Sequence, residues 1–198
     1  MQQLENQLLP GDGGIDKRLS SFFNSLYDVA IDPTSVSTRI ISMEQGKAVS
    51  GAFADTALQL EKLKSSTVNQ IEDTLNAFNT LTTEMASINE QITSNGQSGA
   101  APNAVLDLRD RVLTEIAKLA TISVDYSESG AAKVTLGATG MGPTLVEART
   151  ASKLEHLVTN DTTLQLVVNK NGSKSTTNQA TGGVVHGLVM AYGSVDET

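Results

Sequence analysis

Apolar side chains recur every three or four positions over most of the first 120 residues. In residues 15–31 they fall on one face, which predicts an amphipathic helix. The Asp32–Pro33 dipeptide predicts the boundary with a second helix, because Asp is a favoured N-cap and Pro fits the first helical position. The two helices are expected to form a tight antiparallel hairpin. Its expected core residues are Leu19, Phe22 and Leu26.

The second helix is predicted from about Ser35 to Thr93, a span without proline. Gly46 and Gly51 each cost such a helix about 1 kcal/mol relative to Ala, too little to break it, and they indicate close backbone contact or a bend. At 1.5 Å per residue, a helix of about 55 residues is on the order of 80 Å long, which predicts a rod.

An apolar seam runs along the later part of this helix, with a spacing of about 3.6 residues that is typical of a bundle or coiled coil. Phe78 and Met85 are assigned to the bundle core. Such faces usually pack within their own chain, and the alternative is that part of the seam contacts neighbouring subunits. The seam consists of Leu60, Leu63, Thr67, Ile71, Leu75, Phe78, Leu81, Met85, Ile88 and Ile92.

After the loop "TSNGQSGAAPN", Asn103 is expected to cap a third helix that contributes Leu113 to the core. From residue 121 the pattern changes to alternation, as in "TISVDY", "AKVTLG", "TLVEA" and "TTLQLVVN", with Gly and Asn turn signals between. The polar tract "NGSKSTTNQATGG" follows. The sequence therefore predicts an α+β fold, an elongated antiparallel helical bundle with long helices plus a small β-rich domain. The expected segments are a flexible N-terminal segment over residues 1–14, a helical rod over 15–120, a β-rich domain over 121–180, and a truncated return toward the helical domain over 181–198.

Composition narrows the classes of function. The net charge is −8 without any Lys/Arg cluster, which disfavours nucleic acid as a partner. The weakly polar stretch at 182–193 is shorter than the roughly 20 residues that cross a bilayer, so no membrane insertion is expected. The absence of cysteine excludes disulfides and thiolate sites. No basic region followed by an apolar core opens the chain, so a secretory signal peptide is not expected.

The densest charge cluster lies in the third helix and consists of Asp107, Arg109, Asp110 and Arg111. Catalysis by paired carboxylates needs a cleft and two pKa values that differ, whereas flanking arginines keep both carboxylates ionised. We therefore interpret the cluster as a packed, ion-paired helix turn, with Arg111 pairing to Asp107 and Glu115 four residues away.

The two histidines, His156 and His186, are 30 residues apart, too isolated to predict a metal centre. The turn "GATGMG" lacks the spacing of a phosphate or dinucleotide loop. No catalytic, metal or cofactor-binding residue is assigned.

Three stretches resemble the flagellar hook-associated protein 1 family, the FlgK family of hook-filament junction proteins. They are "SSFFNSLYDVAIDPTSVSTRIISMEQGKAVSGAFADTALQLEKL", then "SINEQI" with "PNAVLDLRDRVLTEIAKLATISV", and "TGGVVHGLVMAY". The apolar heptad segments expected at both ends of an axial protein are missing, which predicts a truncated core. The residues that carry the motif are Asp32, Pro33, Asn103, Leu106, Asp107, Arg109 and Asp110.

The resemblance implies a structural subunit without enzymatic activity or cofactor. It implies export through the flagellar type III apparatus to the extracellular flagellum, and assembly of identical subunits into a ring between hook and filament. The implied partners are the hook protein, the second junction protein, filament proteins and, through the missing termini, an export chaperone. The alternatives are another axial protein, such as the second junction protein or a flagellin-like protein, and a helical coiled-coil binding module.

Overall fold

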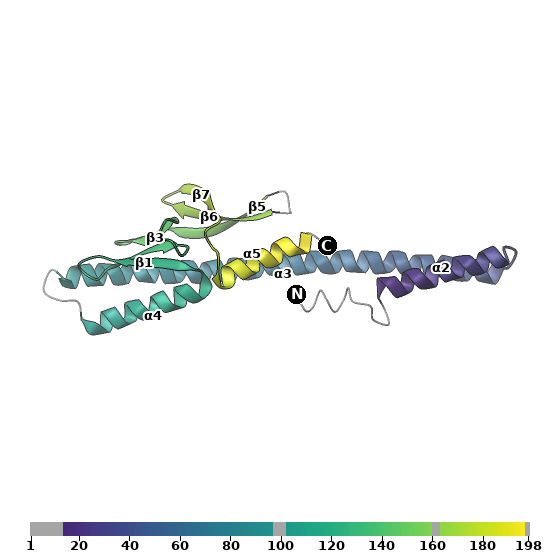
Figure 1. The fold of residues 1–198 in the computed structure, drawn as a ribbon, viewed down its shortest axis with the longest axis horizontal. Coiled ribbons are helices and arrows are strands. Elements are labelled where there is room, and N and C mark those ends of the chain that lie inside the picture. Colours follow the sequence, from purple (N-terminus) through teal and green to yellow (C-terminus); the bar gives the residue numbers. More distant parts are fainter. Residues whose placement is uncertain (1–13, 97–101, 160–162, 197–198) are drawn as a thin grey trace. The chain divides into compact units, whose positions relative to one another are not determined.

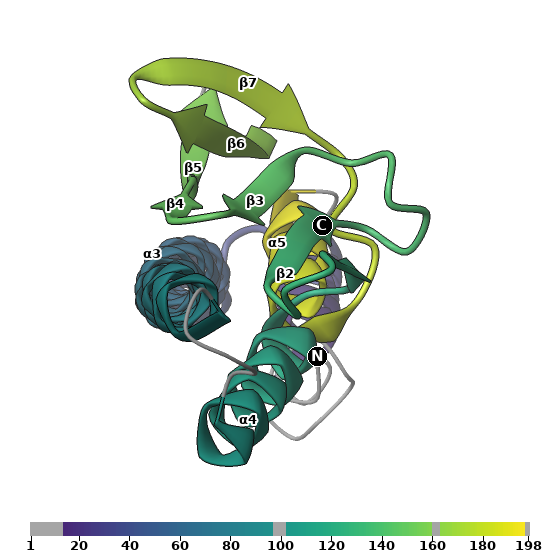
Figure 2. The ribbon, with the colours of Figure 1, turned by 90° about the vertical axis from the view of Figure 1, so that its left-hand side faces the viewer.

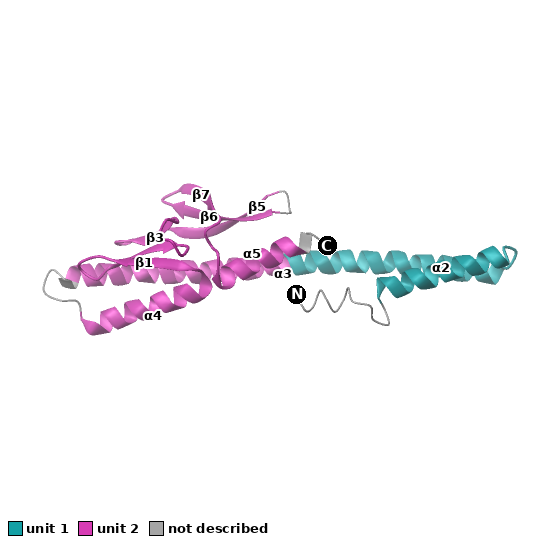
Figure 3. Ribbon diagram, viewed as in Figure 1, with its two compact units in different colours: residues 1–64 teal, residues 65–198 magenta. Residues whose placement is uncertain are grey.

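The computed structural model describes residues 14–96, 102–159 and 163–196. In these ranges the chain forms four helices and two antiparallel sheets (Figure 1), which confirms the α+β class. It divides into two compact units at Lys64/Ser65, within the longest helix, and not at the expected boundary near residue 120 (Figure 3). The helices are α2 (Ile15–Ile31), α3 (Val36–Gly96), α4 (Asn103–Leu119) and α5 (Gly183–Asp196).

The first unit is a hairpin in which α2 lies alongside the beginning of α3 (Figure 1). Its inward face is centred on the buried Ser25, whose hydroxyl donates to the carbonyl oxygen of Phe22. Leu19 and Phe22 are half-buried on this face. Leu26 is 42% exposed, so its assignment to the core was wrong. Successive helical residues are about 100° apart, which turns Leu26 away from a face centred on Ser25.

The two predicted glycine contacts in α3 differ. A Cβ placed on Gly46 would lie 3.2 Å from the Phe22 ring, so the absence of a side chain lets the ring approach the helix. A Cβ on Gly51 would meet no atom within 4 Å. Close backbone contact is therefore present at Gly46 and absent at Gly51.

The second unit carries the strands, which lie beside the later part of α3 (Figure 2). Sheet A has the order β1-β2-β3-β4 and sheet B the order β5-β6-β7, all antiparallel. Helix α5 packs against α4 and β6. The strands are β1 (Ile122–Tyr126), β2 (Ala132–Leu136), β3 (Thr144–Glu147), β4 (Thr150–Ala151), β5 (Lys153–Thr159), β6 (Thr163–Lys170) and β7 (Ser173–Thr177).

Strand β7 lies in the polar tract "NGSKSTTNQATGG", for which the apolar pattern predicts no strand. Its residues are almost all exposed and show no apolar alternation, so only its backbone pairing with β6 makes it a strand. The preceding Asn171–Gly172 turn has φ angles of 52° and 88°, the left-handed pair that a two-residue hairpin requires. The Asn-Gly turn signal was therefore informative although the strand after it was missed.

The core of the second unit is built around the seam of α3. Phe78 and Met85 are fully buried and Leu113 of α4 is 7% exposed. From Ile71 onward the seam packs in one cluster with the inward faces of both sheets and with α4 and α5. This part of the seam is an intramolecular core, the first of the two alternatives that the periodicity allowed.

Candidate functional site

The turn between α2 and α3 contains the first two motif residues. The Asp32 carboxylate accepts hydrogen bonds from the Thr34 hydroxyl (2.8 Å) and the Thr34 backbone N–H (3.2 Å). These bonds favour the charged form, the side-chain bond most, and lower the pKa of Asp32 from its ordinary value of 3.8.

The capping role that we assigned to Asp32 was wrong. Helix α3 begins at Val36, so Pro33 lies in the turn and not in the first helical position. Ser35 takes the capping role instead, because its hydroxyl oxygen accepts a hydrogen bond from the Thr38 backbone N–H (3.4 Å). Asp32 closes the turn by binding Thr34, two residues on, as Asp side chains often do.

Asn103 also does not cap its helix. It is the first residue of α4, and Pro102 occupies the N-cap position without a side-chain hydrogen bond. The Pro102 carbonyl oxygen accepts hydrogen bonds from the backbone N–H groups of Val105 (2.9 Å) and Leu106 (3.3 Å). The start of α4 is thus set by backbone bonds.

Arg109 connects α4 to the turn between β1 and β2. Its Nη1 donates to the Gly130 carbonyl oxygen at 2.7 Å, and its Cζ lies 4.5 Å from the centre of the Tyr126 ring. Its Nε donates to Asp110 Oδ1 at 2.8 Å. The side chain is only 13% exposed, so Arg109 serves as a three-way connection between helix and sheet.

The expected pairs around Arg111 do not form. Among the described residues, the ion pairs of α4 join Arg109 to Asp110 (2.7 Å) and Lys118 to Glu115 (2.6 Å). Arg111 and Asp107 are both exposed. Arg109 lies on the side of the helix that faces the sheet, where it binds the Gly130 carbonyl oxygen and the Tyr126 ring. Glu115 pairs with Lys118.

Two asparagines of α3, missed in the sequence, hold the sheets to the helix. Asn79 accepts from the Leu154 backbone N–H (2.8 Å) and donates to the Leu154 carbonyl oxygen (2.9 Å). Asn89, fully buried, accepts from the Ala132 backbone N–H (2.8 Å) and donates to the carbonyl oxygens of Ala132 (2.8 Å) and Ala148 (3.0 Å). The sequence could have indicated both asparagines, because each one directly follows a residue of the apolar seam, Phe78 or Ile88.

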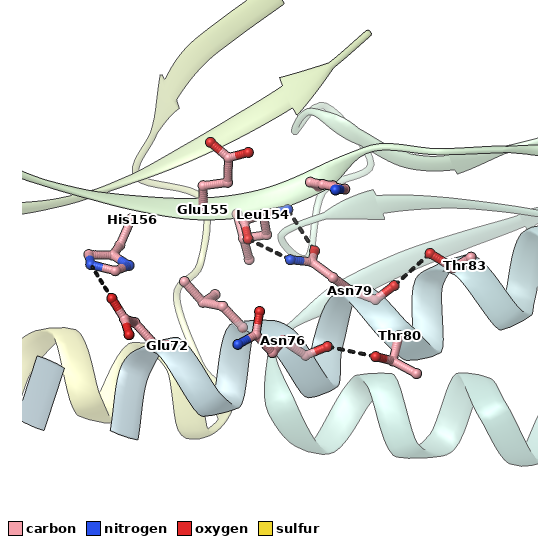
Figure 4. A pocket seen from close by; sticks show the side chains of 10 residues that line it. Glu72, Asn76, Asn79, Thr80, Thr83, Leu154, Glu155 and His156 are labelled. Carbon is pink, nitrogen blue, oxygen red and sulfur yellow. Dashed lines mark hydrogen bonds and ion pairs between the residues drawn. The ribbon is translucent and has the colours of Figure 1, made fainter. Parts of the chain in front are cut away.

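An open groove of about 640 Å³ lies between α3 and β5 (Figure 4). Glu72 Oε1 of α3 lies 3.8 Å from His156 Nε2 of β5, and Asn79 reaches Leu154 beside them. The His156 side chain is only 19% exposed. The groove brings together polar groups that connect one helix to one strand.

Charged side chains also join the two sheets. Glu147 of β3 lies 3.3 Å from Lys133 Nζ of β2 and 3.5 Å from Lys170 Nζ of β6. Hydrogen bonding to Lys133 and its positive charge, followed by Lys170, lower the pKa of Glu147. In sheet B, hydrogen bonds from Lys174 and Asn169 lower the pKa of Glu155.

The described residues share three further properties. No group of three or more His, Cys, Asp or Glu side chains there is placed to hold a metal ion. None of the helices in that part of the chain is long and apolar enough to cross a membrane. Every buried side-chain nitrogen and oxygen atom described has a hydrogen-bond partner.

The fold and these contacts describe a structural helical domain, in which polar side chains hold helices and sheets together. Residues 1–198 match the family described as "Flagellar hook-associated protein FlgK helical domain", and the chain belongs to this family. The family consists of structural proteins of the flagellum.

Two curated relatives support the assignment. Flagellar hook-associated protein 1 of Bacillus subtilis strain 168 is 29% identical over 119 residues, which cover 60% of this chain and 24% of the relative. The protein of the same name from Salmonella typhimurium strain LT2 is 25% identical over 156 residues, covering 78% of this chain and 28% of the relative. The chain thus spans about a quarter of the length of these relatives.

A solved structure supports the fold. The flagellar hook junction protein FlgK from Burkholderia pseudomallei superposes with a TM-score of 0.83 at 26% sequence identity. The match covers 96% of this chain and 35% of that protein.

Proposed function

We propose that this chain is part of a structural subunit of the bacterial flagellum that joins the hook to the filament and is needed for filament attachment. The observation that carries this proposal is the family match over residues 1–198. The structurally similar Burkholderia protein is a flagellar hook junction protein, which supports the same role. The subunit is exported through the flagellar type III apparatus and resides in the extracellular flagellum.

The surface of the first unit supports a role in assembly. Ten of its large apolar side chains are more than two-fifths exposed in the isolated chain. Side chains of this kind on a helix hairpin favour contact with another protein surface, because burying them removes apolar area from water. We propose that identical subunits in a ring cover these side chains. These side chains are Phe23, Leu26, Tyr27, Ile31, Val36, Ile40, Ile41, Met43, Phe53 and Leu58.

The proposed partners above and below the ring are the hook protein, the second junction protein and filament proteins. Catalysis is not part of the proposal, since the family consists of structural proteins of the flagellum. The motif residues contribute by fixing geometry, Arg109 between α4 and sheet A and Asp32 in the turn before α3.

Deletion of the gene that encodes this chain tests the proposal. Electron microscopy should show hooks without attached filaments, and flagellin should accumulate in the culture medium. A plasmid copy of the full gene should restore the filaments. Normal filament number and length in the deletion strain would overturn the proposed function.

A further inference from the structure

The apolar face of helix α3 does not by itself fix the register in which the helix packs along the two sheets. Its buried face is a repeating series of apolar side chains, from Ile71 through Ile92. Because the repeat is near that of a coiled coil, sliding the helix by about seven residues would bring a similar apolar face to the sheets. Apolar burial depends mainly on area, so it distinguishes such registers poorly.

Asn79 distinguishes these registers of α3 at sheet B. Strand β5 is an edge strand, paired with β6 on one side only, and Leu154 lies opposite Val168 in that pairing. The Asn79 side-chain amide binds both the N–H and the carbonyl oxygen of Leu154. It thus supplies the donor and acceptor that a further strand would supply.

Asn89 distinguishes the registers of α3 at sheet A. The pairing of β2 with β3 ends at Val134 and Val146, and Ala132 and Ala148 lie beyond it. The Asn89 amide occupies the opening between these strands and binds the backbone of Ala132 and Ala148. Ala148 has a φ of 53°, which takes its backbone out of the strand conformation at this point.

We infer that Asn79 and Asn89 are positioning residues that select a single register of α3 against the two sheets. Each amide is satisfied only where a backbone N–H and carbonyl face it, so a slipped register leaves buried polar groups without partners. A buried asparagine fixes the register of coiled coils by the same principle. The inference concerns this chain alone and is independent of the proposed role in the flagellum.

The absence of cysteine allows spin labels to be attached at two engineered cysteines in the 198-residue chain. Asp73 of α3 and Ser175 of β7 report on sheet B, and Ser87 of α3 with Asp125 of β1 reports on sheet A, all four being exposed. Pulsed electron spin resonance then measures the distribution of distances for each pair. The parent chain should give one narrow distribution per pair.

Asn79→Leu should add a second population or broaden the distribution for sheet B, and Asn89→Leu should do so for sheet A. Amide hydrogen exchange at Leu154 should become about 10-fold faster or more in Asn79→Leu, as expected for the loss of a buried hydrogen bond. Asn79→Asp keeps the acceptor for the Leu154 N–H, so exchange there should stay close to that of the parent. Asn76→Leu, at an exposed position of the same helix, is the matched control and should change neither measurement.

Unchanged distance distributions in both Leu variants, with unchanged exchange at Leu154, would overturn the inference. Equal acceleration of Leu154 exchange in Asn79→Leu and Asn79→Asp would also overturn it, because the acceptor would then have no specific role. Should Asn89→Leu fail to fold, the half-buried Asn79 site decides the question through this Leu and Asp comparison.

Discussion

Arg109 Nη1 donates a hydrogen bond of 2.7 Å to the carbonyl oxygen of Gly130, 21 residues further along the chain. Gly130 has a φ of 84°, a conformation that residues with a side chain rarely adopt, and this turns its carbonyl toward the arginine. The same guanidinium lies over the Tyr126 ring. The Arg109 side chain therefore fixes the hairpin β1–β2 against α4.

Arg109→Ala should lower the free energy of unfolding by about 2 to 3 kcal/mol, the sum expected for a hydrogen bond to a charged donor and a cation–π contact. Arg109→Lys should recover only part of this, because an ammonium lacks the planar fork. Urea denaturation followed by circular dichroism measures the change. Arg111→Ala, at an exposed position, is the control and should stay within about 0.5 kcal/mol of the parent. Equal effects at the two arginines would contradict the assignment.

The two glycines of α3 should respond differently to alanine. Gly51→Ala should stabilise the chain by up to about 1 kcal/mol, because alanine is the better helix former and the new Cβ meets open space. At Gly46 the new Cβ would press on the Phe22 ring at 3.2 Å, so the gain should be smaller or reversed. Thermal melting of the two variants side by side measures the difference. Identical shifts would show that Phe22 does not pack on Gly46.

In the hairpin, Phe22→Ala should cost more stability than Leu26→Ala. Phe22 is half-buried against Gly46, whereas Leu26 is exposed, so we expect about 1 to 3 kcal/mol for the first and less than about 1 kcal/mol for the second. Denaturant titration of the isolated chain measures both values. A larger loss at Leu26 would place that side chain in the core after all.

Stability should fall as the pH is lowered below about 4.5. The pKa values of Glu147 and Glu155 are lowered from the ordinary 4.5 in the folded chain, Glu147 by Lys133 first and Glu155 by Lys174 first. A carboxyl group with a lowered folded pKa contributes stability that is present above its unfolded pKa and lost as the pH falls through the folded pKa. Melting temperatures from pH 7 to pH 3 test this. Glu147→Gln should flatten the acid side of the profile, and an identical profile would exclude Glu147 as a contributor.

The proposed assembly surface makes a separate prediction. Tyr27→Ser is expected to reduce filament attachment in cells while leaving the melting temperature of the isolated chain almost unchanged, because the Tyr27 side chain is 68% exposed. Motility assays and filament counts measure the first effect. Glu44→Gln, at an exposed polar position of α3, serves as the control. Full filament attachment in Tyr27→Ser, with Ile31→Ser behaving alike, would remove this face from the proposal.

The repeating apolar pattern predicted the helices, most of the strands and the core of the second unit. The spacing of Phe78 and Met85 predicted a buried helical face, because side chains three or four residues apart lie on one side of a helix. The change to alternation at Thr121 predicted strands for the corresponding reason. These are local properties, in which each residue's conformation depends mainly on its sequence neighbours.

The hydrogen-bond and ion-pair partners of the polar side chains could be identified only from the tertiary structure. Arg111 had carboxylates at favourable helical spacing, yet the ion pairs form at Arg109 and Lys118. Asp32 and Asn103 matched the preferred residue types for caps, and backbone geometry placed the helix starts elsewhere. Leu154 and Ala132 lie 75 and 43 residues from the asparagines that bind them, so no local pattern connects them. The sequence by itself determined which faces are apolar, since periodicity sets burial. Only the folded chain decided which groups meet across those faces, because a hydrogen bond depends on distance and direction between segments that the sequence leaves far apart.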